Sequence, residues 1–394
     1  MFVNFFHELQ SAGVPVTLKC EHMQRAGSFK IRGALNFVRL LDRSQVRGLV
    51  TASAGNHAQG VALAGSAASL PVTVVMPVFA PLAKITATQG YGAKVELRGN
   101  SLEEARAEAL SIAAKDGLIY VPPFDDDAII AGQGTLGLEV LEQVPDLREI
   151  LVPTGGGGLL AGVAVAVKSL RPEVKVIGVQ ASAMDGVCRS FRAHQVETST
   201  PRRTIADGVA VAGPSARTFA LIERYVDDMV SCTDDQIAHA MLLLIEHSKL
   251  VVEGAGALAV AAIQSGVDRP RGSAVAVLSG GNIDINLLGS IVRRGLVEAG
   301  RYQHLTVEVS DTPGELALVS RVIADSGGNI LEVNHNRDAP HMPVGIAVLD
   351  LVLEVNGPEH FLQIIDALSE SGMRALPGAS ASLASEGARR RHQL

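Results

Sequence analysis

Two segments of this sequence combine residue types that could hold and use a small phosphorylated cofactor. The first contains a lysine, Lys30, inside Gly27-Ser-Phe-Lys-Ile-Arg-Gly33. The second is a glycine run between an apolar stretch at 150–152 and an alanine- and valine-rich stretch at 159–170 that predicts a helix. Residues without Cβ allow backbone N–H groups to converge at a helix N-terminus, where the helix dipole adds positive charge. We therefore predict an anion site at Gly155, Gly156, Gly157 and Gly158.

The spacing of these glycines excludes two common kinds of phosphate site. The run is not Gly-x-x-x-x-Gly-Lys-Ser/Thr, and it lacks the Gly-x-Gly-x-x-Gly spacing of dinucleotide sites. A small phosphorylated cofactor remains. Pyridoxal 5′-phosphate carries one phosphate and one aldehyde and needs a lysine amine for its Schiff base, so Lys30 favours this cofactor.

Two further turns could complete such a site. Ser279 follows the buried strand-like run 274–278, and α/β sheets bind ligands at the carboxyl ends of strands. The small-residue turn at 51–60 lies between a predicted strand and a predicted helix, and its N–H groups and hydroxyl suit a substrate carboxylate. The residues that we expect to bind substrate there are Ser53, Ala54, Gly55, Asn56 and His57.

Together these segments closely resemble the fold-type II pyridoxal-phosphate enzymes, and most closely the threonine dehydratase (threonine ammonia-lyase) family. The resemblance covers nearly the whole chain and also includes the segments 19–34, 131–135, 206–211 and 253–257. Family members carry some tens of residues before this lysine, including a Thr-Pro-Leu segment and a first helix. Here Lys30 comes earlier in the chain, so we expect the edge of the catalytic domain to differ from that of the family members.

The resemblance implies a role for each predicted site residue. Lys30 would hold the cofactor and take the proton from Cα, Asn56 would bond the phenolic oxygen, and the glycine run would bind the phosphate. Ser279 would face the pyridine nitrogen, which a serine hydroxyl cannot keep protonated. Serine racemases have a serine where this chain has Ala54, so elimination is favoured over racemisation. The ring of His57 is expected to be a structural partner rather than a base.

The expected reaction is α,β-elimination of L-threonine to 2-oxobutanoate and ammonia, with L-serine giving pyruvate as a side activity. An L-serine or 3-hydroxyaspartate ammonia-lyase stays open, as does a catalytically impaired amino-acid sensor. We expect Phe124 and the loop 209–214 to shape the substrate pocket. Asp207 and Glu253 lie in loops that resemble those near cation sites of some relatives. We expect both to be solvated or salt-bridged carboxylates, and we predict no metal site.

Composition narrows the class of protein. The 394 residues are 47% apolar, rich in glycine and without tryptophan, with a formal net charge of −7. Such a surface disfavours nucleic acid and anionic membranes. Three cysteines without metal spacing, together with the absence of a signal-peptide pattern or a long apolar run, favour a cytoplasmic protein without a membrane span.

Alternating strand and helix patterns between about residues 48 and 300 predict a mostly parallel α/β fold. Within it, Ser101 and Glu104 predict the start of a helix that ends at Gly117. We place a catalytic domain at 1–300. The resemblance implies a two-lobed, tryptophan synthase β-like plan, with a smaller lobe inserted at about 51–125.

A different pattern begins near residue 303. Leu305, Val307 and Val309 alternate with polar residues, as in a half-solvated antiparallel strand. The order of predicted elements over 303–380 is βαββαβ, the ferredoxin-like plan. This part resembles an ACT domain, which implies pairing with another copy and an amino-acid effector such as isoleucine or valine. A domain that only dimerises stays open. We expect a homo-oligomer, a dimer or tetramer, and a disordered tail at 381–394.

Overall fold

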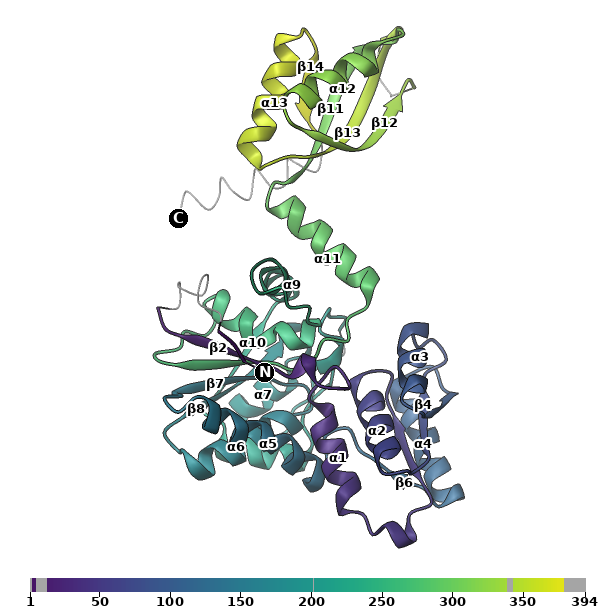
Figure 1. Ribbon diagram of the computed structural model, residues 1–394, viewed down its shortest axis with the longest axis vertical. Helices are drawn as coiled ribbons and strands as arrows, with labels where there is room; N and C mark the ends of the chain where they lie inside the picture. The colour runs from purple at the N-terminus through teal and green to yellow at the C-terminus, as the bar shows by residue number, and fades with distance from the viewer. Residues whose placement is uncertain (1, 5–12, 201, 339–342, 379–394) are drawn as a thin grey trace. The chain divides into compact units, whose positions relative to one another are not determined.

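The computed structural model describes residues 2–4, 13–200, 202–338 and 343–378 (Figure 1). The predicted tail at 381–394 lies outside the described residues. The chain divides into two compact units, residues 1–287 and residues 288–394. The first unit contains two sheets and the second contains one.

The large sheet of the first unit has six strands in the order β1-β2-β10-β7-β8-β9. All neighbouring pairs are parallel except the antiparallel pair β1–β2. Strands buried on both faces read as continuous apolar runs, as β7 and β10 do. The strands are β1 (Phe2–Asn4), β2 (Val16–Cys20), β7 (Glu149–Pro153), β8 (Lys175–Ala181), β9 (Asp228–Cys232) and β10 (Ala274–Leu278).

Helices cover both faces of this sheet, with α5 and α6 on one side and α9 and α10 on the other (Figure 1). Helices α5 and α6 approach closely because glycines meet at their crossing. A Cβ on Gly162 would lie 2.2 Å from the carbonyl oxygen of Ile130 and 2.7 Å from the nitrogen of Gly134. The helices are α5 (Asp127–Gln143), α6 (Gly158–Leu170), α7 (Gly186–Ala193), α8 (Ala216–Tyr225), α9 (Asp234–Leu243) and α10 (Gly254–Gln264).

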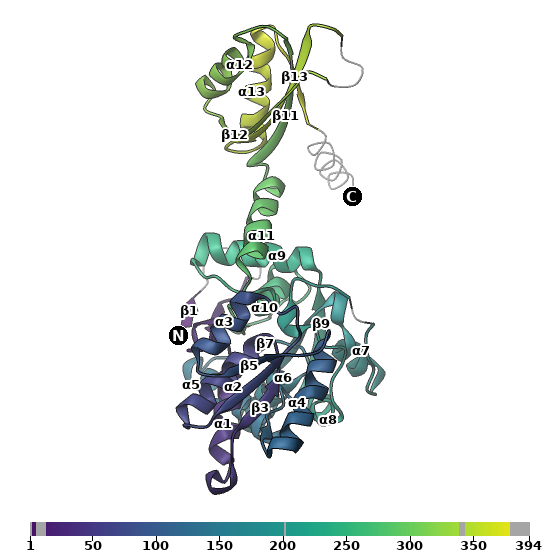
Figure 2. The same ribbon diagram turned by 90° about the vertical axis from the view of Figure 1, so that its right-hand side faces the viewer.

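The small sheet is four-stranded and parallel, in the order β5-β4-β3-β6. Leu49 packs with α2 on one face, whereas the next residue, Val50, packs with α4 on the other, as strand geometry requires. Figure 2 shows these helices around the sheet. The elements are α1 (Lys30–Leu40), β3 (Leu49–Ala52), α2 (Asn56–Ala67), β4 (Val72–Met76), α3 (Leu82–Gly90), β5 (Lys94–Leu97), α4 (Leu102–Asp116) and β6 (Ile119–Tyr120).

The second unit has the βαββαβ element order that the sequence predicts. Its antiparallel strands follow the order β12-β13-β11-β14, and two helices cover one face. Leu305, Val307 and Val309 of β11 are buried against those helices, which confirms the predicted alternation. The elements are α11 (Ile285–Glu298), which crosses the boundary between the units, and β11 (Tyr302–Ser310), α12 (Glu315–Asp325), β12 (Asn329–Asn336), β13 (Ile346–Glu354), α13 (Pro358–Glu370) and β14 (Arg374–Pro377).

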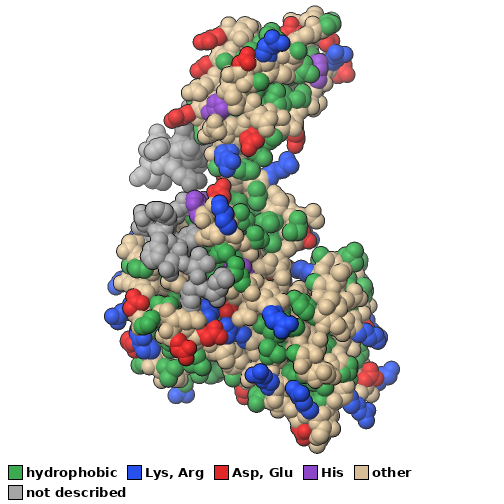
Figure 3. Space-filling model, in the orientation of Figure 1, with side chains coloured by type: hydrophobic (Ala, Val, Ile, Leu, Met, Phe, Trp, Pro, Cys, Tyr) green, Lys and Arg blue, Asp and Glu red, His purple; other side chains and the backbone are tan. Residues whose placement is uncertain are grey.

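Lys, Arg, Asp and Glu side chains are interspersed over the visible face of the first unit (Figure 3). Within the described ranges, none of the helices combines the length and the apolar character needed to cross a bilayer.

The close α5–α6 crossing predicts that one glycine-to-alanine substitution destabilises the protein and that a matched one does not. Gly162→Ala should destabilise the first unit by about 1–3 kcal/mol, because its Cβ would force the helix backbones apart. Gly90→Ala is the matched control, because the space around Gly90 at the end of α3 is open. We expect the midpoint of thermal unfolding, followed by circular dichroism, to fall for Gly162→Ala only. Equal midpoints would show that the crossing tolerates a methyl group.

Candidate active site

A pair of backbone hydrogen bonds joins the lysine segment to the turn after β10. Phe29 N donates to Ser279 O at 3.0 Å, and Gly281 N donates to Gly27 O at 2.9 Å. Gly27 has φ +68°, and a Cβ there would lie 2.4 Å from Oδ1 of Asn282, so only glycine fits. This junction holds Lys30, the first residue of α1, beside the carboxyl edge of the large sheet.

The Lys30 side chain is partly buried, and no carboxylate of the described residues is bonded to it. Nζ donates to the carbonyl oxygen of Pro123 at 2.8 Å and lies 5.2 Å from the centre of the Phe29 ring. Burial lowers the pKa of Lys30 to about 8, and the charge of Glu253 opposes this shift. A fraction of the amine is therefore neutral near physiological pH, as a nucleophile or base requires.

The glycine run forms the turn between β7 and α6. A Cβ on Gly156 would lie 2.4 Å from the Phe124 ring, and one on Gly158 would lie 2.8 Å from Cβ of Phe124. Helix α6 begins without a side-chain cap and without an acidic residue in its first turn. Among the described residues, no hydrogen bond uses the N–H groups of Gly155–Gly158. The turn therefore presents free N–H groups and a helix N-terminus, the donor set that binds a phosphate.

The turn after β3 supplies a second set of free N–H groups. Helix α2 begins at Asn56 without a side-chain cap, and the described part of the chain gives no partner to the amides of Asn56, His57 and Ala58. The Ser53 hydroxyl accepts from Gly55 N at 3.2 Å, which closes the turn. These amides suit a carboxylate at the helix N-terminus.

The His57 ring is a structural partner, as expected. Its Nε2 lies 3.0 Å from the carbonyl oxygen of Val121, and the residue is buried. Burial, together with the charge of Lys30, lowers the pKa of His57 to about 3. The ring is therefore neutral at physiological pH.

Ser279 is buried immediately after β10. Because β10 pairs in parallel with β7, Ser279 and the glycine run emerge at the same edge of the sheet. The Ser279 hydroxyl lies 3.3 Å from the carbonyl oxygen of Ala255. An O–H group can also accept, so it can bond a second polar atom facing it.

The expectation that Glu253 is a solvated or salt-bridged carboxylate is wrong. Glu253 is buried, and its Oε1 accepts from Nδ2 of Asn56 at 2.7 Å. Two glycines let the carboxylate approach, since a Cβ on Gly280 would lie 2.3 Å from Oε1 and one on Gly208 would lie 3.1 Å away. Burial, reinforced by Asp207, raises the pKa of Glu253 to about 7. This carboxyl group is therefore part of the site.

The Asn56 amide is fixed from its other side as well. Its Oδ1 accepts from Nδ2 of Asn282 at 2.7 Å, and the same nitrogen donates to the carbonyl oxygen of Ala26 at 3.0 Å. Asp207, by contrast, is exposed and pairs with Lys84 at 2.7 Å, which confirms the expectation of a salt-bridged carboxylate. Over the described residues, no cluster of His, Cys, Asp and Glu has the arrangement of a metal site.

A partly buried charge network that the sequence analysis did not identify connects α1 to α5. Arg32 donates to Glu21 from Nε at 2.7 Å and from Nη2 at 2.9 Å, and it donates to Glu139 from Nη1 at 2.6 Å and from the same Nη2 at 2.8 Å. Lys19 also reaches Glu139, at 2.6 Å. The bond to Arg32 lowers the pKa of Glu139 to about 2. The sequence shows charged residues of both signs at 19–32, but it does not show that Glu139 on α5 is their partner.

Comparison with known proteins agrees with this geometry. The profile of the pyridoxal-phosphate dependent enzyme family matches residues 4–280. The chain belongs to this family. It is 46% identical over 361 residues to an L-threonine ammonia-lyase of Thermotoga maritima, covering 91% of this chain and 90% of the relative. An L-threonine ammonia-lyase of Geobacter sulfurreducens is 43% identical, covering 94% and 92%.

Among solved structures, this chain is similar to the processed form of threonine deaminase isoform 2 from Solanum lycopersicum. It matches with a TM-score of 0.69 and 39% identity, covering 72% of this chain and 80% of that chain. The predicted family and its α/β catalytic fold are therefore confirmed, and so is pyridoxal phosphate as the family's cofactor.

The residues of this chain fit pyridoxal phosphate. Phe124 lies so close to the glycine turn that Gly156 and Gly158 admit no Cβ, and no hydrogen bond of the described residues uses the amides of the turn. Lys30 has a lowered pKa and bonds a backbone carbonyl oxygen, so its amine is available for an aldehyde. The chain thus offers a phosphate site, an amine and a hydroxyl from three neighbouring segments.

The charge of Glu253 raises the pKa of Lys30, against the effect of burial, and this leads to a prediction about the pH dependence of cofactor uptake. Ionised Glu253 favours the charged form of Lys30, so Glu253→Gln should lower the pKa of Lys30 below its present value of about 8. The rate at which cofactor-free enzyme takes up pyridoxal phosphate should then reach its midpoint at a lower pH. Gln keeps an acceptor for Asn56, so the site should stay assembled.

The matched control is Glu142→Gln, the same change on an exposed part of α5. It should leave the midpoint where it is in the unaltered protein. Identical midpoints for Glu253→Gln and the unaltered protein would show that Glu253 does not act on Lys30.

Proposed function

We propose that this protein is a threonine ammonia-lyase that converts L-threonine to 2-oxobutanoate and ammonia with pyridoxal phosphate. The observation that carries the proposal is the match with L-threonine ammonia-lyases over nine-tenths of their length, on a chain that retains Lys30, Ser279 and the glycine turn. A catalytically impaired sensor would lack at least one of these three features.

The chain's own residues divide the work of binding. The backbone amides of Gly155–Gly158 hold the phosphate, and the amides at 56–58 hold the substrate carboxylate. Asn56, fixed by Glu253 and Asn282, is positioned to bond the phenolic oxygen with the second hydrogen of its Nδ2. When bound, the cofactor supplies an electron-withdrawing ring that stabilises negative charge at Cα.

Proton transfer falls to Lys30. Its amine, freed when the substrate amine replaces it, takes the proton from Cα, and its lowered pKa suits this task. The β-hydroxyl leaves, so the elimination removes one water. Hydrolysis of the resulting enamine uses one water and releases ammonia and the 2-oxo acid.

Two residues favour elimination over other outcomes. The Ser279 hydroxyl can bond a neutral pyridine nitrogen but cannot keep it protonated, which makes the ring a moderate electron sink and favours prompt loss of the hydroxyl. Ala54 has no group that could return a proton to the opposite face of Cα. L-serine carries the same leaving group, so pyruvate from L-serine is the expected side activity.

The C-terminal unit is proposed to be a regulatory ACT-like domain. Its βαββαβ order and sheet order support this assignment. By the same proposal the protein is a cytoplasmic homo-oligomer, a dimer or tetramer, that serves isoleucine biosynthesis. Isoleucine or valine would be the allosteric effector.

The direct test is incubation of the purified protein with L-threonine and quantification of 2-oxobutanoate and ammonia. We expect equimolar products, and Lys30→Ala should lower kcat by at least about 10³-fold, since no other amine follows the same turn. It should also lose the cofactor absorbance near ~410–420 nm. Lys115→Ala, on the exposed face of α4, is the control and should behave like the unaltered protein. Retained steady-state turnover in Lys30→Ala would contradict the proposed mechanism.

Regulation is tested by deleting residues 301–394. The truncated protein should keep most of its turnover, because every residue of the proposed site lies before residue 288. It should lose any response to isoleucine or valine, which for typical coupling is about 5–150-fold in affinity. Kinetics and analytical ultracentrifugation with and without each amino acid measure both effects. An undiminished response would place the effector site in the first unit.

A further inference from the structure

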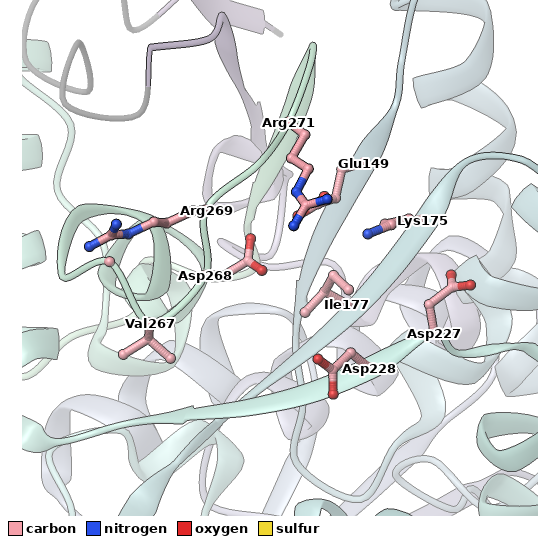
Figure 4. A pocket seen from close by; sticks show the side chains of 10 residues that line it. Glu149, Lys175, Ile177, Asp227, Asp228, Val267, Asp268, Arg269 and Arg271 are labelled. Carbon is pink, nitrogen blue, oxygen red and sulfur yellow. The ribbon is translucent and has the colours of Figure 1, made fainter.

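A second group of charged side chains lies at the opposite edge of the large sheet from the proposed active site. β7, β8 and β9 begin with Glu149, Lys175 and Asp228, whereas the glycine turn and Ser279 follow the carboxyl ends of their strands. These three residues line a pocket of about 490 Å³ (Figure 4). The other lining residues are Ile177, Asp227, Gly266, Val267, Asp268, Arg269 and Arg271.

Two carboxyl groups that face each other in this pocket, Glu149 and Asp268, each have a buried oxygen to which no described residue donates. Glu149 is 6% exposed, and its Oε1 has no hydrogen-bond partner among the described residues. Oδ2 of Asp268 is also buried without a partner, and the Asp268 carboxylate points into the pocket toward Glu149 (Figure 4). A buried acceptor without a donor is costly, so these oxygens suit a ligand that brings N–H donors and positive charge.

The same pocket also contains cations and an apolar surface. Lys175 and Arg271 direct their charged ends toward the Glu149 side of the pocket, whereas Arg269 points away (Figure 4). Ile177 and Val267 contribute aliphatic side chains to its lining. Acidic acceptors, basic donors and an aliphatic surface in one pocket match a small molecule that carries one charge of each sign and a hydrocarbon group.

We propose that this pocket binds a small α-amino acid with an apolar side chain. Its ammonium group would lie on Glu149 and Asp268, its carboxylate on Lys175 and Arg271, and its side chain against Ile177 and Val267. This site is separate from the substrate site and from any site in the C-terminal unit.

Proton release distinguishes this pocket from other amino-acid sites. Burial, together with Asp268, raises the pKa of Glu149 to about 8, while Lys175 opposes and Asp227 adds to the shift. Below that pH the acid pair retains a proton that the ligand's ammonium group must displace. Binding should therefore release a proton near pH 7, and the affinity should fall as the pH is lowered.

The experiment is isothermal titration of the full-length protein with L-valine in buffers of different ionisation enthalpy, between pH 6 and 8.5. Isobutylamine and isobutyrate, which carry only one of the two charges, should bind at least tenfold more weakly. Glu149→Gln should weaken L-valine at least tenfold and abolish the proton release. Glu173→Gln is the control, since Glu173 pairs with Arg171 at the same sheet edge outside the pocket.

A second variant, Arg271→Gln, tests the site without risk to folding, because Arg271 is exposed. It should weaken L-valine at least fivefold and leave isobutylamine unchanged. The proposal is overturned if Glu149→Gln and the unaltered protein give the same L-valine isotherm and proton release. It is also overturned if isobutylamine binds as tightly as L-valine, because the pocket would then be a simple cation site.

Discussion

The site depends on the hydrogen-bonded junction between the segment 27–29 and the turn 279–281. These residues are about 250 positions apart in the chain, and the bonds of Phe29 N and Gly281 N place them in register. The junction fixes the start of α1, and with it Lys30, against the carboxyl end of β10. In the proposed mechanism Lys30 bonds one end of the cofactor and the Ser279 hydroxyl bonds the other, which requires a constant distance between these two residues. The charge network around Arg32 braces the same helix against α5.

Near this junction lie two ionisable groups, Lys30 and Glu253, whose pKa values are shifted by burial. Lys30 has a carbonyl oxygen rather than a carboxylate as its bonded partner, and its pKa falls to about 8. Glu253, buried beside Asn56, has its pKa raised to about 7. Both groups thus titrate near physiological pH, and each favours the charged form of the other. Perturbed pairs of this kind are characteristic of sites that move protons.

The sequence was sufficient to predict local structure and the family to which the chain belongs. Ser101 and Gly117 predicted the ends of α4, and the structure has the helix at Leu102–Asp116, with Ser101 accepting from Glu104 N and Gly117 at φ +67°. The alternation around Val307 predicted β11 equally well. Both depend on short-range rules of capping and strand geometry.

Long-range contacts were not predictable. The turn 253–257 could be recognised from the sequence, but the burial of Glu253 could not, because it depends on Gly208 and Gly280, which leave room for the carboxylate. The partner of Arg32 on α5 lies more than 100 residues away, and the pocket around Glu149 forms only because three strands begin at the same sheet edge. Such arrangements follow from packing of the whole unit, which local periodicity does not encode.

The most direct measurement is a crystal structure of the full chain with pyridoxal phosphate bound. The account predicts a covalent bond from Nζ of Lys30 to the cofactor, phosphate oxygens within about 3.2 Å of the amides of Gly155–Gly158, and the Ser279 hydroxyl at a similar distance from the pyridine nitrogen. A cofactor attached to another lysine, or a phosphate bound away from the glycine turn, would contradict it.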